Sequence, residues 1–471
     1  MRVAITALFV AAAACGDNAG VALDVTPVHG DAFGGYQITL AGDVARLGDV
    51  ESVTIGDRLA YDVTVDAQAG TITATTQGSP AFGAADIFVV GSRDVGGASF
   101  TFDQPVAGVP GTWAAFGASL TQGAQSLGVN IHSQLAGVSA LIAKQAGVDL
   151  AMALFADGAL PGLQLSDFTP DCVTTKNDEG DFINALFDVL KDPATGDIDV
   201  ARARVDPTLT PRDVGVAGAK LSDILTGAVG NNALIERIVE EPLTTKPGDF
   251  LTPVTVSEID RIATFDPDVG FATDIMANDV DNAVLGADDL HLDAITPLDQ
   301  EQALLGQLAQ RLGALHGTYF IANLPHLTFL PNVSVLRAQR IAAGTDTAQS
   351  FDAKVTQIDD AVDDYNAALA SAIAPFPNLH VVDFEGQVEK IRATGVVAGG
   401  EMLTVAHFDG LLSLDDLHFT DTGYGVFANL FIDAMNAQLG TQIPEVDLDA
   451  VHATDALSPS KLTAAGFTCV P

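Results

Sequence analysis

The pattern of apolar and polar positions changes once along the chain, near residue 106. Between residues 21 and 106, short stretches rich in Val, Ile, Thr and Phe alternate with turns that contain Gly and Asp. Several short strands at this spacing are typical of a small β-sandwich. We therefore expect an N-terminal β domain over residues 21–106. The clearest stretches are Tyr36–Leu40, Ser52–Ile55, Thr71–Thr75, Asp86–Val90 and Ser99–Phe102.

After a linker at Pro105–Pro110, apolar runs of strand length alternate with helical patterns. This alternation predicts a mostly parallel sheet covered by helices on both sides, over residues 107–471. Sheets of this kind bind ligands at the carboxyl ends of their strands. The expected strands are Thr112–Phe116, Val214–Ala217, Phe271–Met276, Thr318–Ala322 and Leu379–Phe384. The expected helices are Val129–Ala146, Gln300–Leu315, Phe351–Ala374 and Thr422–Leu439.

The charge of the chain narrows the choice of partners. Lys and Arg number 21 against 61 Asp and Glu, which gives a formal net charge of −40. A charge of this size repels phosphate backbones and anionic lipid surfaces, so we expect no nucleic-acid partner. A hydrophobic content of 48% is ample for a large core.

The first residues have the pattern of a targeting segment. Arg2 supplies a basic start, and Val3–Ala14 is apolar apart from Thr6. That run has the length of a signal-peptide core and is too short to span a membrane. Small residues directly before Cys15 resemble a bacterial lipoprotein processing site. We therefore expect residues 1–20 to be signal and tether, with a lipid on Cys15 that anchors the exported protein to the cell envelope. An ordinary secretory signal cleaved nearby is the alternative.

The chain has three cysteines, Cys15, Cys172 and Cys469. If Cys15 carries lipid, the other two are left to pair, and an exported protein permits a disulfide. Two free thiols are the alternative. No spacing of Cys and His fits a zinc site, so we expect no metal.

Two parts of a Ser-His-Asp triad lie close together near the C-terminus. Asp415 stands three residues before His418, a spacing at which a carboxylate can hold the imidazole Nδ1–H and leave Nε2 as a base. Asp416 is the alternative carboxylate. A nucleophile must come from elsewhere, and Ser119 follows an apolar run of strand length. His418 would take the serine proton and later deliver it to the leaving group.

A tetrahedral intermediate also needs hydrogen-bond donors around its oxyanion. The candidates are the backbone N–H groups of Ser119 and Gly218 and the side-chain amide of Asn278. The helix that Ser119 opens would also favour negative charge. Each residue has a simpler interpretation: Ser119 as a helix cap, Gly218 and Asn278 as turn residues, and His418 as a surface histidine.

Four short blocks, in order, resemble the SGNH/GDSL hydrolase family. The resemblance spans residues 110–440. It implies a three-layer α/β/α domain, a serine nucleophile, Asp415 rather than Asp416 as the orienting carboxylate, and no metal or organic cofactor. The blocks are Gly117-Ala118-Ser119-Leu120 against the family's Gly-Asp-Ser-Leu, Gly218 after an apolar run, Met276-Ala277-Asn278-Asp279 against Gly-x-Asn-Asp, and Asp415 to His418 followed by Gly423-Tyr424.

Two positions depart from the pattern of this family. Ala118 replaces the aspartate beside the nucleophile, and Met276 replaces the glycine of the third block. Neither position handles a proton, so the substitutions bear on rate and substrate choice and leave room for a degenerate enzyme. Two other histidines, His326 and His407, have no comparable carboxylate context.

The N-terminal part carries a second resemblance. The glycines and apolar residues between Val25 and Gly42 are similar to the start of IPT/TIG domains, which are immunoglobulin-like modules. In that family the module is a spacer or an interaction unit. The resemblance implies an immunoglobulin-like β-sandwich without catalytic residues.

We therefore expect an exported, membrane-tethered serine esterase or lipase-like hydrolase. Its substrate would be a lipid, a small acyl ester or an acylated sugar, cleaved through an acyl-enzyme. A carbohydrate deacetylase is the alternative within the same family. The alternative from another class is a non-catalytic surface adhesion or scaffold protein, with the β domain as its working part.

Overall fold

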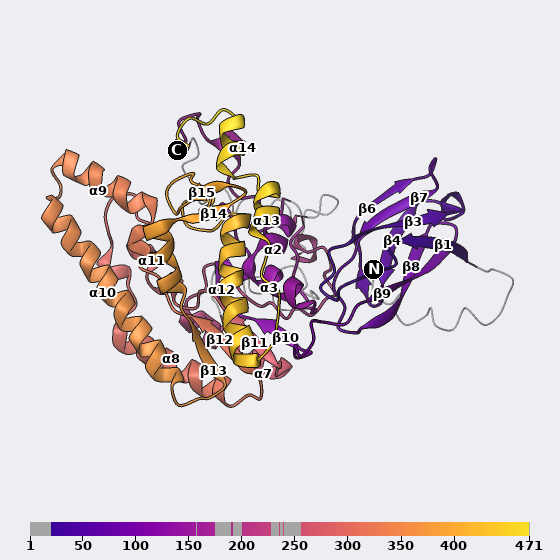
Figure 1. The fold of residues 1–471 in the computed structure, drawn as a ribbon, viewed down its shortest axis with the longest axis horizontal. Helices are drawn as coiled ribbons and strands as arrows, with labels where there is room; N and C mark the ends of the chain where they lie inside the picture. The colour runs from indigo at the N-terminus through magenta and orange to yellow at the C-terminus, as the bar shows by residue number, and fades with distance from the viewer. Residues whose placement is uncertain are drawn as a thin grey trace. The chain divides into compact units, whose positions relative to one another are not determined.

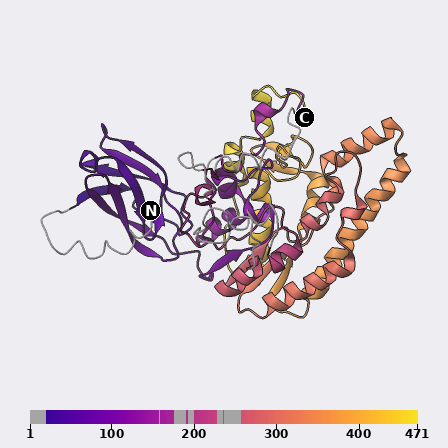
Figure 2. The same ribbon diagram turned by 180° about the vertical axis from the view of Figure 1, so that it is seen from behind.

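The computed structural model describes residues 20–156, 158–174, 190–191, 200–227, 235, 239 and 256–470. It divides the chain into two compact units. The first holds Met1–Gly30 with Gly34–Asp103, and the second holds Asp31–Phe33 with Gln104–Pro471. Figures 1 and 2 show both units. The expected lipidation site, Cys15, lies outside the described residues.

The N-terminal unit is one mixed sheet of nine strands. Eight strands follow the order β5-β4-β8-β9-β1-β3-β7-β6, and β2 pairs with β9. Along β3, Ile38 and Leu40 are buried between more exposed neighbours, as the period-2 pattern predicts. The strands are β1 Val21–Thr26, β2 His29–Gly30, β3 Gln37–Gly42, β4 Val50–Ile55, β5 Arg58–Leu59, β6 Tyr61–Asp66, β7 Thr71–Thr75, β8 Gly83–Gly91 and β9 Val95–Phe102.

The prediction of an immunoglobulin-like β-sandwich is wrong. A sandwich consists of two sheets packed face to face, but β1 hydrogen-bonds on both of its sides. Val21 and Ala22 pair in parallel with Gly96 and Gly97 of β9, whereas Leu23–Thr26 pair antiparallel with β3. One strand therefore joins the halves into a nearly closed, barrel-like sheet. Local patterning predicts strands, but it does not predict their partners.

The C-terminal unit contains a sheet of four short parallel strands in the order β10-β11-β12-β13. Because the strands are parallel, their carboxyl ends share one edge. The strand expected at Thr318–Ala322 forms over that range, whereas the one expected at Phe271–Met276 ends at Ala272. The strands are β10 Trp113–Ala115, β11 Val269–Ala272, β12 Thr318–Ala322 and β13 Leu379–Val382.

Helices pack around this small sheet. Helix α12 contacts β12 and β13, and α8 and α10 lie side by side and contact β13 (Figure 1). The helices are α1 Ser119–Gln122, α2 Ile131–Ala136, α3 Val138–Ala146, α5 Leu221–Thr226, α7 Glu258–Phe265, α8 Leu298–Gly313, α9 Pro331–Ala343, α10 Ala348–Ile373, α11 Phe384–Thr394, α12 Asp421–Leu439, α13 Leu448–Thr454 and α14 Pro459–Ala464. A short hairpin pairs β14 Val396–Ala398 with β15 Glu401–Leu403.

The prediction of a three-layer α/β/α fold with a mostly parallel sheet is also wrong. The largest sheet is the mixed N-terminal one, and the parallel sheet has only four strands. The strand expected at Val214–Ala217 does not form, and only an isolated bridge joins the preceding Asp213 to Ala115. Val214 and Val216 are nevertheless fully buried. A short apolar run can be buried as irregular backbone, and its periodicity cannot reveal that.

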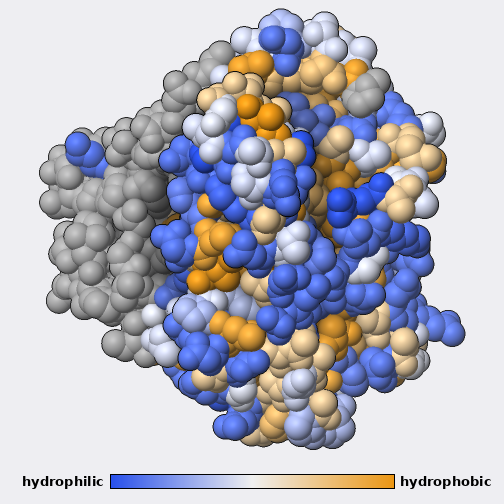
Figure 3. All heavy atoms as spheres, turned by 90° about the vertical axis from the view of Figure 1, so that its left-hand side faces the viewer, coloured by the Kyte–Doolittle hydropathy of each residue, from blue (hydrophilic) through white to orange (hydrophobic). Residues whose placement is uncertain are grey.

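The face of the molecule drawn in Figure 3 is mostly hydrophilic, with apolar residues scattered among polar ones. This distribution fits a chain with 61 acidic residues. Within the described ranges, no helix is both long and apolar enough to cross a membrane.

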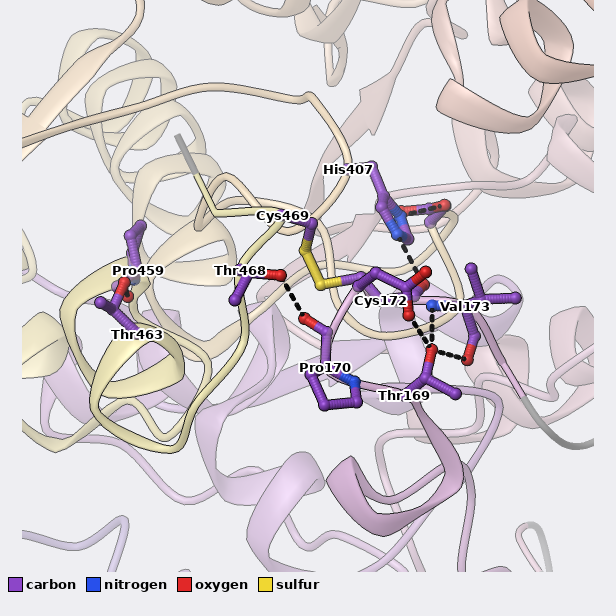
Figure 4. The surroundings of a disulfide bond; sticks show 11 residues. Thr169, Pro170, Cys172, Val173, His407, Pro459, Thr463, Thr468 and Cys469 are labelled. Atoms are coloured by element: carbon purple, nitrogen blue, oxygen red, sulfur yellow. Dashed lines mark hydrogen bonds and ion pairs between the residues drawn. A yellow bond between two sulfur atoms is a disulfide. The ribbon is translucent and has the colours of Figure 1, made fainter.

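A disulfide joins Cys172 to Cys469, which are 297 residues apart in the chain. Figure 4 shows the surrounding contacts, in which the Thr468 hydroxyl donates to the Pro170 carbonyl at 3.1 Å. Cys172 is buried in an apolar cluster that includes Phe408. The disulfide therefore ties the chain end to the segment that follows residue 170.

Candidate active site

Ser119 lies at the turn from β10 into α1. Gly117 has φ +141° there, and a Cβ on it would lie 2.8 Å from Asp274 Oδ1, so the turn requires glycine. Asp274 follows β11 and accepts hydrogen bonds from the N–H groups of Ala118 at 2.9 Å and Leu120 at 2.6 Å. This carboxylate holds the backbone on both sides of Ser119. The N–H of Ser119 itself has no acceptor among the described residues.

His418 and Asp415 form a buried pair on the loop before α12. Asp415 Oδ2 lies 2.6 Å from His418 Nδ1, and the two side chains are 1% and 7% exposed. Asp415 Oδ1 also accepts from the N–H groups of Leu417 and His418. In the neutral imidazole, with Nδ1–H held by the carboxylate, Nε2 carries the lone pair. That nitrogen is buried and has no hydrogen-bond partner in the described part of the chain.

The segment after α1 is interlocked with the loop that carries this pair. Ser126 N–H donates to Ser413 Oγ at 2.9 Å, and Leu414 N–H donates to Ser126 Oγ at 3.2 Å. Leu127 N–H donates to Asp415 Oδ2 at 2.5 Å, across 288 residues of sequence. These bonds hold the two distant segments in one region of the unit.

Ser119 and His418 are connected indirectly, through contacts of the residues next to them. Within the described ranges, no hydrogen bond joins Ser119 Oγ to His418 Nε2. The residues that follow them, Leu120 and Phe419, line one small apolar cavity. Asp274, which binds the N–H of Leu120, is close enough to His418 to help raise the pKa of its imidazole.

Gly218 and Asn278 lie beside the Ser119 turn. Gly218 has φ +82°, a backbone conformation that favours glycine. Its neighbour Ala217 donates its N–H to Gln122 Oε1 of α1 at 2.8 Å, and Asn278 Nδ2 donates to Ala219 O at 2.7 Å. Bonds on both sides therefore tie the Gly218 turn to α1 and to Asn278. One of the two amide hydrogens of Asn278 is used in this way.

Burial and charge shift the pKa values of the pair in opposite directions. Burial by itself would raise the pKa of Asp415 and lower that of His418. Their charges and hydrogen bond, together with the backbone N–H groups that bind Asp415 and the charges of Asp274 and Asp281 near the imidazole, outweigh burial. The pKa of Asp415 therefore lies below its ordinary value and that of His418 above it. Burial raises the pKa of nearby Asp281 to about 6, and the charge on His418 partly opposes that shift. The site therefore favours the cationic form of His418.

The structure distinguishes between the two candidate carboxylates. Asp416 lies 2.7 Å from Nδ1 of His407, not beside His418, and His407 Nε2 lies 3.2 Å from the Cys172 carbonyl oxygen (Figure 4). The prediction that His407 has no comparable carboxylate context is wrong, because Asp416, nine residues further along the chain, lies beside it.

Sequence reasoning missed Asp274 and Asp281. Asp274 falls within the strand expected at Phe271–Met276. Because β11 ends at Ala272, Asp274 instead lies in the segment just after the strand. A carboxylate at the carboxyl end of a parallel strand is the signal that could have found it. Asp281 follows Asn278 in the same loop and offers no signal of its own in the sequence. Among the described residues, one group of three side chains could hold a metal ion, and it includes none of the site residues.

Comparisons with known proteins give no assignment. No family model matches the chain, and no curated protein matches it significantly. Among solved structures, the chain is similar to SGBP-B from a complex xyloglucan utilization locus in Bacteroides uniformis, with 17% sequence identity and a TM-score of 0.17. The match covers 22% of this chain and 29% of that one. The chain thus spans less than a third of that protein, and so low a score supports no conclusion about fold or function.

Proposed function

We propose that this chain is a serine hydrolase that cleaves carboxylic esters through an acyl-enzyme on Ser119. The observation that carries the proposal is the state of His418, whose Nδ1 is held by a buried carboxylate while its buried Nε2 has no partner among the described residues. Leaving a buried polar atom without a partner costs free energy, so it is uncommon without a functional reason. A general base needs such a nitrogen.

In the proposed reaction, His418 Nε2 takes the Ser119 proton as Oγ attacks the ester carbonyl carbon. Asp415 stabilises the imidazolium, which then gives the proton to the leaving alcohol. Water then attacks the acyl carbon while His418 Nε2 takes its proton, and that proton passes to Ser119 Oγ as the acid is released. Hydrogen bonds between nucleophile and base are often long without substrate, so we expect the Ser119–His418 bond to form on binding.

The oxyanion would be held beside the Ser119 turn. The N–H of Ser119 is one proposed donor, and the N–H of Gly218 and the second amide hydrogen of Asn278 are the others. Asp274 positions the first of these by holding the flanking N–H groups of Ala118 and Leu120. The four sequence blocks that resemble SGNH/GDSL hydrolases support the same roles.

The disulfide supports a location outside the cytoplasm, because disulfides persist in oxidising compartments. The proposed substrate class remains broad: a lipid, a small acyl ester or an acylated sugar. A lipid anchor at Cys15 would keep the enzyme at the cell envelope.

The test is hydrolysis of p-nitrophenyl esters of increasing acyl length, together with acetylated sugars. We expect turnover by the wild type and a loss of at least about 1,000-fold in Ser119→Ala. Ser334→Ala is the matched control, since Ser334 is an exposed serine on α9, and it should keep full activity. A folded wild type without activity on any ester, or a Ser119→Ala variant as active as the control, would contradict the proposal.

A further inference from the structure

Three side chains from three elements converge beyond the carboxyl ends of β12 and β13. His326 follows β12, Asp363 lies on α10, and Glu385 lies in the first turn of α11. His326 Nε2 lies 3.0 Å from Asp363 Oδ1 and 3.6 Å from Glu385 Oε1. All three atoms lie within 4.8 Å of one another. The prediction that His326 lacks a carboxylate context is therefore wrong, because its partners are distant in sequence.

The arrangement at His326 differs from an ordinary ion pair. His316 also has two carboxylates, but Asp266 faces its Nδ1 at 2.9 Å and Asp268 faces its Nε2 at 3.1 Å. A protonated imidazole satisfies both of them with its two N–H groups. At His326 both carboxylates face the same nitrogen. One N–H cannot serve two acceptors well, whereas a cation can be bound by both oxygens at once.

A neighbouring amide, Asn366, holds the loop of His326 and the side chain of Glu385 in place. Asn366, on α10 one turn after Asp363, donates from Nδ2 to Leu324 O at 2.8 Å and to Glu385 Oε2 at 3.1 Å. Its Oδ1 accepts from Leu324 N–H at 2.8 Å. Asn366 therefore fixes both the loop that carries His326 and the carboxylate of Glu385. Outer hydrogen bonds of this kind are what orients the ligands of metal sites.

A third acid adds to the negative charge around the imidazole. Asp359 lies on α10 one turn before Asp363 and accepts a hydrogen bond from Thr328 Oγ1. Its charge and that of Glu385 both act on His326. Three carboxylates thus surround one imidazole in a chain with a net charge of −40. A divalent cation would offset their mutual repulsion.

We propose that His326, Asp363 and Glu385 form a binding site for a divalent first-row transition-metal ion of the Zn²⁺ type. One imidazole nitrogen and two carboxylate oxygens are ligands that Zn²⁺ accepts, whereas Ca²⁺ and Mg²⁺ take oxygen ligands. Tetrahedral ligands at about 2.1 Å from zinc lie about 3.4 Å from one another. The separations of 3.0 and 3.6 Å bracket that value, and water completes the coordination.

The proposed metal site shares no residue with the proposed catalytic site. Its ligands come from the segments after β12 and β13, whereas Ser119 follows β10 and Asp274 follows β11. The metal would cross-link α10, α11 and the loop after β12. Its binding does not depend on whether Ser119 is a nucleophile.

The experiment is isothermal titration of the chelator-treated full chain with Zn²⁺, and in parallel with Ca²⁺ and Mg²⁺. We expect one Zn²⁺ per chain and no measurable heat with the other two ions. His326→Ala and Glu385→Gln should each weaken Zn²⁺ binding at least about tenfold, and a Zn²⁺-dependent rise in melting temperature should disappear with them. His316→Ala is the matched control and should bind as the wild type does.

Co²⁺ provides an optical check on the ligands. Its visible absorption bands should appear with the wild type and with His316→Ala, but not with His326→Ala. Equal Zn²⁺ affinity in His326→Ala and wild type would overturn the proposal, as would an absence of Zn²⁺ binding by the folded wild type. The conservative Glu385→Gln variant keeps the test valid if His326→Ala fails to fold.

Discussion

Two His–Asp pairs share one loop of the C-terminal unit, and they differ in what the second imidazole nitrogen does. In the first pair, Asp415 holds His418 Nδ1, and Nε2 has no partner among the described residues. In the second pair, Asp416 holds His407 Nδ1, and Nε2 lies 3.2 Å from the carbonyl oxygen of Cys172. Their carboxylates are consecutive residues. A nearby carboxylate therefore does not by itself identify a general base, and the proposal for His418 depends on its unbonded Nε2 as well.

Replacing each of the two histidines should produce the greatest difference in activity. His418→Asn should lower kcat/KM for an activated ester by about 10⁴-fold or more, because it removes the only proposed base. His407→Asn should stay within about tenfold of wild type, because that side chain touches no reacting atom. Steady-state kinetics on both variants, with circular dichroism to check folding, measures the difference. Equal losses in the two variants would show that the comparison is wrong.

The two aspartates should differ in the same way. Asp415→Asn should cost about 10⁴-fold in kcat, while Asp416→Asn should cost far less. The wild-type pKa of His418 is raised, so activity should fall with acidification through a pKa above the ordinary 6.5. Without the negative charge of Asp415, the burial of His418 lowers the pKa of its imidazole. The acidic limb of the pH–rate profile should therefore move to lower pH in Asp415→Asn and stay in place in Asp416→Asn. An unmoved limb in Asp415→Asn would contradict the pairing.

The next effect concerns the disulfide next to the His407 pair. Replacing Cys172 and Cys469 together by serine should lower the free energy of unfolding by about 2–5 kcal/mol, since the bond closes a long loop. We expect activity at low temperature to fall much less, because the His418 loop is also held by Ser126 and Leu127. Denaturant unfolding without reductant measures the stability. A double variant as stable as the wild type would mean that the disulfide does not form.

The smallest expected effect is a change in the pH dependence of stability. It concerns Asp213, a buried carboxyl group without a histidine partner. Burial raises the pKa of Asp213 to about 7, and its Oδ2 has no partner within the described ranges. The folded state therefore holds a proton that the unfolded state has lost, and its contribution to stability falls as the pH rises from about 4 through 7. Asp213→Asn should therefore gain stability relative to wild type as the pH rises across that range.

Denaturant unfolding at several pH values between 4 and 8 tests this difference. Asp86→Asn, at an exposed position on β8, is the control and should show no such trend. A difference between Asp213→Asn and wild type that does not change with pH would contradict the buried, protonated state.

The sequence predicted the features that depend on neighbours along the chain. The strand Thr318–Ala322, the helix that begins near Thr422 and the three-residue spacing of Asp415 and His418 all rest on local geometry. Features that depend on residues distant in the sequence were either not predicted or predicted wrongly. Examples are the double pairing of β1, the bonds of Asp274 around Ser119, and the acids around His326. Local periodicity carries no information about which segments meet.

If Ser119 is a nucleophile activated by His418, a reagent specific for activated serines should modify it. The most direct measurement is the site of modification by a fluorophosphonate, located by peptide mass spectrometry. We expect one adduct, on Ser119. It should form more slowly as the pH falls through the pKa of His418, and it should be absent in His418→Asn. An unmodified Ser119 in folded protein, or an adduct on another serine, would contradict it.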